Sequence, residues 1–148
     1  MQDLPHHYHV SATAFTRSNV EVTSKGLDAL ETAGPAEFGG PGDLWSPETM
    51  LVGAVANCLI LSFRATARAA RLDWANLTVD VEGVLERVEK VTLFTRFILN
   101  AKLEVEHGVD EAKARKLLEK AKKHCLVSNS LIGESELNAT VEFVVNAD

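Results

Sequence analysis

The chain contains two cysteines, Cys58 and Cys125, and their chemistry is the first question that the sequence raises. Two thiols are too few for a disulfide-stabilised scaffold, and no close spacing of Cys and His indicates a zinc site. Each cysteine is therefore either an inert apolar side chain of the core or a reactive thiol. A reactive thiol in an apolar segment needs a nearby cation to stabilise its thiolate and a carboxylate to orient that cation.

The composition indicates one globular domain. Of the 148 residues, 46% are hydrophobic, which is enough for a buried core. The 15 Lys and Arg against 21 Asp and Glu give a net charge of −6, which argues against binding to nucleic acid or to an anionic membrane. The longest apolar run, around Leu51 to Phe63, is interrupted by Asn57 and Ser62 and is shorter than the roughly 20 residues that cross a bilayer. The first residues lack the order of a signal peptide, so we expect a cytoplasmic protein with reduced thiols.

Cys58 lies in a segment with a strong helix prediction. The residues Ser46-Pro47-Glu48 combine an N-cap, a proline at the first helical position and an acid in the first turn. The following residues are apolar on most faces until the arginines near residue 70. We therefore expect a helix over about 47–71 whose first four turns are enclosed on all sides by a sheet, another helix or a second subunit.

Alternating apolar and polar residues predict strands on both sides of this helix. The further elements expected in chain order are an N-terminal hairpin turning at 17–19, a loop over 32–43, strands over 77–86 and 97–106 that turn near 89–90, an amphipathic helix over about 110–124 that carries Cys125 at its end, and a strand over 137–145. This order is typical of an α+β fold, and we expect a single domain over residues 1–148.

Several segments together resemble the OsmC/Ohr family of osmotically induced and organic hydroperoxide resistance proteins. The resemblance spans nearly the whole chain and rests on Gly39-Gly40-Pro41-Gly42, Ser46-Pro47-Glu48, Ala56-Asn57-Cys58 and His124-Cys125-Leu126-Val127-Ser128-Asn129, in this order. It implies an OsmC-like fold with antiparallel sheets packed around a long buried central helix, in an intertwined homodimer. It also implies a thiol peroxidase for organic or lipid hydroperoxides, in which Cys58 attacks the peroxide and Cys125 resolves the product as a disulfide.

The resemblance further implies that Arg17 and Glu48 keep Cys58 ionised. An arginine stabilises both the thiolate and the departing oxyanion, and a carboxylate orients the guanidinium, so no metal or organic cofactor is required. The sequence departs from the family pattern around Arg17, which lacks a glycine-rich setting, and at Leu126, where many relatives carry proline. These departures favour a less characterised branch, and Arg96 is the next candidate for the cation.

Helix geometry predicts how Glu48 would act. Glu48 and Cys58 are ten positions apart on one helix, which is about 15 Å of rise and leaves them on different faces. We therefore expect Glu48 to serve the Cys58 of a second subunit in a homodimer.

Three functions remain compatible with these residues. The first is a hydroperoxide reductase recycled by a dithiol such as a lipoylated protein. The second is a non-catalytic OsmC-fold protein that binds a small apolar or electrophilic molecule, and the third is an interaction domain with two inert thiols. Taken singly, Glu48 is a helix-start acid, Arg17 a solvated turn residue and each cysteine an apolar filler, so only their combination favours catalysis.

Overall fold

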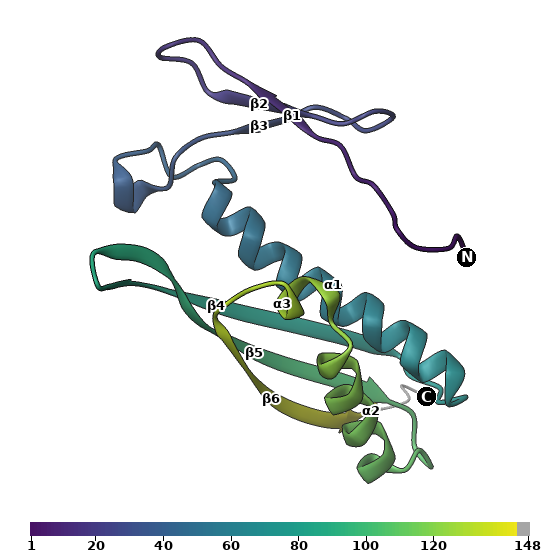
Figure 1. The fold of residues 1–148 in the computed structure, drawn as a ribbon. Helices are drawn as coiled ribbons and strands as arrows, with labels where there is room; N and C mark the ends of the chain where they lie inside the picture. Colours follow the sequence, from purple (N-terminus) through teal and green to yellow (C-terminus); the bar gives the residue numbers. More distant parts are fainter. Residues whose placement is uncertain (145–148) are drawn as a thin grey trace. The chain divides into compact units, whose positions relative to one another are not determined.

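The computed structural model describes residues 1–144 of the chain (Figure 1). It contains two compact units, Met1–Met50 and Leu51–Asp148. The organisation of residues 1–148 as a single domain stays a prediction. Val145, the last residue of the expected final strand, lies outside the described residues.

The first unit contains a three-stranded antiparallel sheet. Its strands, in the order β1-β2-β3, are Ser11–Thr13, Val20–Thr23 and Leu30–Thr32. The β1–β2 hairpin confirms the expected hairpin, and Arg17 lies in its turn. Strand β3 was not expected, because three residues are too few to display an alternating pattern.

The expected loop contains one turn of 3-10 helix, η1 (Ala36–Phe38), and folds tightly on itself. A Cβ atom at Gly40 would lie 1.7 Å from the carbonyl oxygen of Gly34, so only glycine fits at this crossing of two backbone segments. The glycine-rich segment is therefore required by backbone contact in the first unit.

Helix α1 spans Pro47–Ala69 and confirms the expected central helix. At its start, the backbone N–H of Thr49 donates to Ser46 Oγ at 3.1 Å and the N–H of Ser46 donates to Thr49 Oγ1 at 2.8 Å. This reciprocal pair satisfies two backbone donors. The helix ends at a turn in which Arg71 has a left-handed φ of 55° and the Leu72 N–H bonds the Ala67 carbonyl at 2.9 Å.

The second unit contains a mixed three-stranded sheet with the order β4-β5-β6. Strands β4 (Asn76–Val88) and β5 (Val91–Val105) form an antiparallel hairpin whose two turn residues, Glu89 and Lys90, have positive φ angles of 48° and 71°. Both strands are longer than expected. The register shifts between Val84 and Leu85, and the resulting bulge in β5 interrupts the alternation that the sequence would otherwise display.

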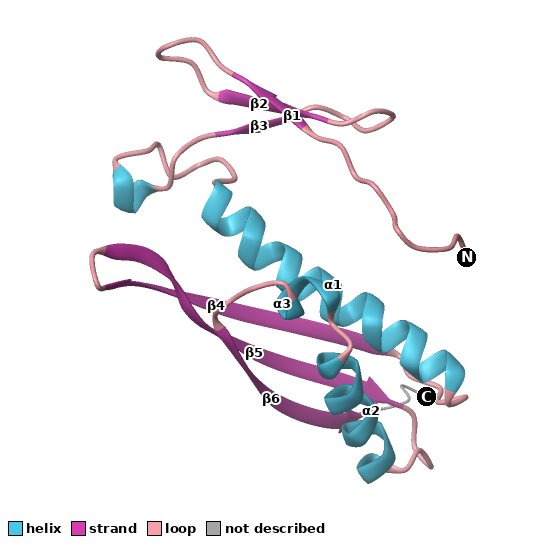
Figure 2. Cartoon of the chain, in the orientation of Figure 1, coloured by secondary structure: helices cyan, strands magenta, loops and turns pink. Residues whose placement is uncertain are grey.

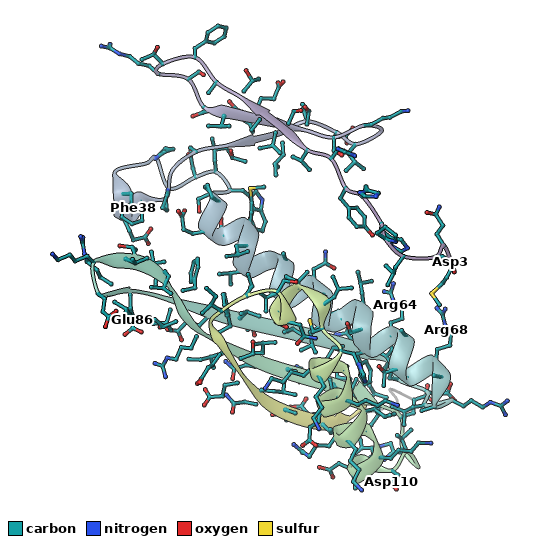
Figure 3. All side chains as sticks on the ribbon, viewed as in Figure 1. Asp3, Phe38, Arg64, Arg68, Glu86 and Asp110 are labelled. Carbon is teal, nitrogen blue, oxygen red and sulfur yellow. The ribbon has the colours of Figure 1, made fainter. Side chains whose placement is uncertain are left out.

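Strand β6 (Glu134–Phe143) pairs with β5 in parallel, so the expectation of purely antiparallel sheets is wrong. Helix α2 (Glu111–Lys123) lies between β5 and β6 in the sequence. It returns the chain to the end of the sheet where β5 begins, and β6 starts there. A helical crossover of this kind makes two strands parallel. Helix α2 confirms the expected second helix, and its N-cap Asp110, labelled in Figure 3, accepts from the N–H groups of Ala112 and Lys113.

One apolar face of this sheet packs with α1 and α2 to form the core (Figure 2). The fully buried members of the core include Phe63, Phe97, Leu59, Leu99, Leu103, Leu118, Val55, Val105 and Cys125. Helix α1 contributes buried residues at four-residue spacing, namely Val55, Leu59, Phe63 and Ala67. Within the described chain, sheet and helix cover one side of α1, and Leu61 on another side is 51% exposed. Enclosure of the helix on all sides therefore stays a prediction that needs a second subunit.

Helix α1 is also the one helix within residues 1–144 that is long and apolar enough to cross a membrane. An 18-residue window in it has a mean hydropathy of 1.6, so the expectation that the apolar segment is too short is wrong on length and composition. Of those 18 residues, 28% are buried inside the structure, and helices in the core of globular proteins can be equally long and apolar. Arg64 and Arg68, labelled in Figure 3, lie in its C-terminal half and are exposed.

The backbone just before β6 lies so close to β5 that only glycine fits at position 133 without a shift of its neighbours. A Cβ atom there would lie 2.9 Å from the Phe94 carbonyl oxygen and 3.0 Å from Phe97 Cε2, and the paired backbone of β5 cannot yield freely. We expect Gly133→Ala to lower the free energy of unfolding in urea by about 1–3 kcal/mol. Gly34→Ala is the matched control, since nothing lies within 4 Å of a Cβ atom at that position. Equal stability of the two variants would contradict this packing.

Candidate thiol site

Cys58 lies on α1 between its buried side and its exposed side, and it is part-exposed. An open pocket of about 450 Å³ lies over it. The pocket is lined by Ala54, Asn57, Cys58, Leu61, Ser62, Ala65, Leu126 and Val127, most of which are apolar. A small apolar molecule in this pocket would lie against the Cys58 side chain.

Cys125 does not sit on a helix, contrary to expectation. Helix α2 ends at Lys123, and Cys125 is the N-cap residue of a short helix, α3 (Leu126–Asn129). Its backbone is extended, with φ −73° and ψ 95°, and its side chain is fully buried in the core. Helix α3 was not expected, because four residues carry no helical periodicity.

The structure brings the two cysteines together within the second unit. Burial raises the pKa of the Cys125 thiol above its ordinary value of 9.0, and the neighbouring Cys58 raises it further by hydrogen bonding and by its negative charge when ionised. The Ser128 hydroxyl and backbone N–H act in the opposite direction and lower the pKa of Cys125. Burial and the nearby Cys58 thus both disfavour the ionised form of Cys125.

The two charged candidates belong to the first unit, whereas both cysteines belong to the second. Arg17 is an exposed turn residue of the β1–β2 hairpin, and Glu48 is half-buried in the first turn of α1. The Oε2 atom of Glu48 is buried and has no hydrogen-bond partner among residues 1–144. Because an unpaired buried carboxylate oxygen is costly, Glu48 has an unmet need for a donor. The catalytic roles of Arg17 and Glu48 stay predictions.

Arg96, the alternative cation, lies on the wrong face of its sheet. It is exposed in β5 and alternates with Phe97, which is fully buried on the face that packs against the helices. Its side chain therefore leaves from the face opposite the core that contains Cys125. As for metals, residues 1–144 contain no group of three or more His, Cys, Asp or Glu side chains that could hold an ion.

Comparison with known proteins decides the family. The model of the OsmC-like protein family matches residues 40–140, a span that includes Glu48 and both cysteines. The chain belongs to the OsmC-like family. This OsmC-like chain is 29% identical over 136 residues to the uncharacterized protein YmaD of Bacillus subtilis, covering 89% of this chain and 91% of YmaD.

Solved structures share the fold of this OsmC-like protein. An OsmC-like protein of unknown function from Vibrio cholerae superposes with a TM-score of 0.85 at 16% identity, covering 92% of this chain and 100% of that one. An organic hydroperoxide resistance protein from Elizabethkingia anophelis superposes with a TM-score of 0.76 at 23% identity, covering 97% and 100%. At these identities the likeness establishes the fold, and the OsmC/Ohr resemblance inferred from the motifs is confirmed.

The raised pKa of Cys125 predicts a loss of stability at alkaline pH in the reduced protein. Above pH 9.0 the unfolded chain releases the Cys125 proton while the folded protein retains it, so the free energy of unfolding falls as the pH rises. Below pH 9.0 both the folded and the unfolded chain keep the Cys125 proton, so the Cys125 thiol adds no pH dependence to the free energy of unfolding there. Urea unfolding under reductant between about pH 8 and pH 10.5 should show a shallower decline for Cys125→Ala than for the wild type.

The matched control is Val105→Ala, which opens a cavity at another fully buried position and keeps the thiol. Its stability should be lower throughout, but the pH dependence should parallel that of the wild type. Parallel curves for all three proteins would contradict the raised pKa.

Proposed function

We propose that this OsmC-like protein is a cysteine-based peroxidase that reduces organic or lipid hydroperoxides at the expense of a dithiol. The observation that carries the proposal is the arrangement of the two thiols. Cys58 is part-exposed in an apolar pocket, and the Cys125 thiol is buried beside it. A peroxidase of this kind needs an accessible attacking thiol with a resolving thiol next to it.

The proposed cycle has three steps. The Cys58 thiolate attacks the outer oxygen of the hydroperoxide, the O–O bond breaks, and the alkoxide leaves as an alcohol after taking up a proton. Cys58 is then a sulfenic acid, and the Cys125 sulfur attacks its sulfur to form the disulfide while hydroxide leaves as water. A dithiol reductant such as a lipoylated protein finally exchanges with the disulfide, which returns both thiols and oxidises the reductant.

The pocket lining favours an apolar substrate. Leu61, Leu126 and Val127 supply branched apolar side chains, and Asn57 and Ser62 are its polar members. An alkyl or lipid chain would bury its hydrocarbon there, whereas hydrogen peroxide would gain nothing from such a lining. We therefore propose organic hydroperoxides as the substrate class, and the cytoplasm, where dithiols stay reduced, as the place of action.

We further propose that Arg17 and Glu48 complete the site in a homodimer, with both residues acting on the Cys58 of a second copy. Two observations support this. The buried Oε2 of Glu48 needs a donor, which a guanidinium would supply, and the sides of α1 away from the sheet keep apolar residues such as Leu61 partly exposed. A second subunit would provide cover for these residues.

The pocket also supports a second candidate function, the binding of a small apolar or electrophilic molecule without turnover. An open, mostly apolar pocket that ends at a thiol would serve such binding equally well. The two functions differ in whether the thiols cycle.

Removal of the attacking thiol distinguishes these functions. With an alkyl hydroperoxide and a dithiol, Cys58→Ser should reduce peroxide consumption to the uncatalysed rate, because no thiolate remains in the pocket. One equivalent of peroxide should convert the wild type to a Cys58–Cys125 disulfide, detected by mass spectrometry of non-reduced peptides.

Cys125→Ser is the matched control, since it keeps Cys58 and removes only the resolving thiol. It should consume one equivalent of peroxide to form the Cys58 sulfenic acid, and excess peroxide should then oxidise this group to the sulfinic acid with consumption of a second equivalent. Wild-type turnover by Cys58→Ser, or intact thiols in the wild type after peroxide treatment, would refute the peroxidase and favour binding.

Subunit mixing tests the shared site. Glu48→Ala and Cys58→Ser chains, each inactive alone, are unfolded, mixed and refolded together. Each mixed dimer should show about half the activity of a wild-type dimer, because one of its two sites receives both wild-type residues. Arg17→Ala should behave like Glu48→Ala in the same mixtures.

The control replaces Cys58→Ser by the double variant Glu48→Ala/Cys58→Ser, which cannot supply Glu48 to its partner. That mixture should stay inactive. A wild-type protein that is monomeric at micromolar concentration, or silent mixed dimers despite proven mixing, would reject the shared site.

A further inference from the structure

Ser62 lies one helical turn after Cys58 on α1 and lines the same pocket. Residues four positions apart on a helix share a face, with their Cβ atoms about 5–6 Å apart. Helical side chains lean toward the N-terminus of their helix, so the side chain of Ser62 covers the turn that carries Cys58. A small molecule that reaches the Cys58 sulfur through this pocket therefore lies near the Ser62 hydroxyl.

Ser62 is on the inner side of the pocket, toward the core. Successive residues of an α-helix are rotated by about 100°, so Ser62 points between the directions of Cys58 and the fully buried Leu59. It is accordingly half-buried, whereas Asn57, on the opposite side of Cys58, is exposed. Ser62 thus supplies a polar group on the enclosed side of a mostly apolar pocket.

The Ser62 hydroxyl is not engaged by its own helix. A serine or threonine inside a helix often donates its hydroxyl to the carbonyl four residues earlier. Thr66 does so, since its Oγ1 donates to the Ser62 carbonyl at 2.8 Å. Within residues 1–144 the Ser62 hydroxyl makes no such bond to the Cys58 carbonyl or to any other group. It is therefore available to donate to a molecule in the pocket.

We propose that Ser62 is a further catalytic residue, whose hydroxyl donates a hydrogen bond to the leaving oxygen of the hydroperoxide. The inference rests on the peroxidase function proposed above. The Cys58 thiolate forms an S–O bond with the outer oxygen, which keeps its hydrogen, while the O–O bond breaks and the electron pair passes to the inner oxygen. The hydroxyl stabilises the charge on this oxygen until the alkoxide takes a proton from water and leaves as an alcohol.

This role predicts a dependence on the leaving group. The side chains of Leu61, Leu126 and Val127 offer no donor to a charge that forms beside them. The alkoxide from tert-butyl hydroperoxide is a strong base with its charge on one oxygen, so it depends strongly on a donor. The acetate from peracetic acid is a weak base with its charge spread over two oxygens, so it needs less help. A merely structural serine would produce no such difference.

The test measures the first step alone, in the Cys125→Ser background, where Cys58 is the remaining thiol. Its second-order rate constants with tert-butyl hydroperoxide, peracetic acid and iodoacetamide are obtained by titrating the thiol that is left after timed reaction. Adding Ser62→Ala should lower the rate constant for tert-butyl hydroperoxide about 10- to 100-fold. The loss with peracetic acid should be less than about threefold. Iodoacetamide, which releases iodide and no oxyanion, should react at an unchanged rate.

Thr66→Val is the matched control, since it removes a hydroxyl from the same helix at a position that does not line the pocket. Its three rate constants should equal those of the Cys125→Ser parent. Ser62→Ala should fold normally, because its hydroxyl makes no bond to the described chain and alanine favours a helix, and an unchanged iodoacetamide rate verifies an intact pocket. Equal slowing with all three reagents would mean that the hydroxyl acts on Cys58 itself and would overturn the proposal, as would equal losses with the two peroxides.

The same measurements separate the role of Ser62 from the function beneath it. A parent chain whose Cys58 reacts with both peroxides no faster than free cysteine would reject the peroxidase and the role of Ser62 together. Rapid oxidation of the parent with unaltered rate constants in Ser62→Ala would retain the peroxidase and reject the role of Ser62 alone.

Discussion

The packing of α1 and α2 on one face of a single sheet is the constraint on which the thiol pair depends. Because β5 and β6 run parallel, α2 must cross that face before the chain returns to the sheet. The chain then turns directly after α2, and the first residue of the turn that is fully buried is Cys125. Its burial against α1 brings it to Cys58. The proximity of two cysteines far apart in the sequence is thus a product of packing.

This packing gives the two thiols different environments. Cys58 lies at the margin of the core, where a pocket reaches it, whereas Cys125 is enclosed. Burial of a resolving thiol limits its contact with oxidants in solution. Burial also disfavours the ionised form of the thiol and raises the pKa of Cys125. Ser128 lowers the pKa of Cys125 and so offsets part of the effect of burial. Access and reactivity are therefore set by separate structural elements, α1 for Cys58 and α3 for Cys125.

The sequence predicts those parts of the fold that have local causes. The N-cap, proline and acid at residues 46–48 locate the start of α1, and amphipathic periodicity locates α2. The parallel pairing of β6 has no local signal, since strand direction depends on the path of the crossover. The incomplete cover of α1 was likewise invisible, because an apolar helix has the same sequence whether one chain or two enclose it. Ser128 lies within one of the family motifs, but its burial and its hydrogen bond to the Cys125 carbonyl follow from the turn of α3.

The unequal lengths of the strands have a consequence for self-association. Pairing of β5 with β6 begins at Arg96, so residues 91–95 of β5 meet no third strand of the β4–β5–β6 sheet within the described chain. A free edge with the sequence Val-Thr-Leu-Phe-Thr is the kind of template on which cross-molecular β-aggregation starts. Two features discourage it: the bulge near Thr95, which distorts the edge, and the charged residues near the end of the hairpin, namely Glu89 and Lys90 at the turn and Glu86 three positions before it, which Figure 3 labels. Edge-to-edge association at this segment is thus opposed by a local irregularity of the strand and by surface charges rather than by burial of the edge.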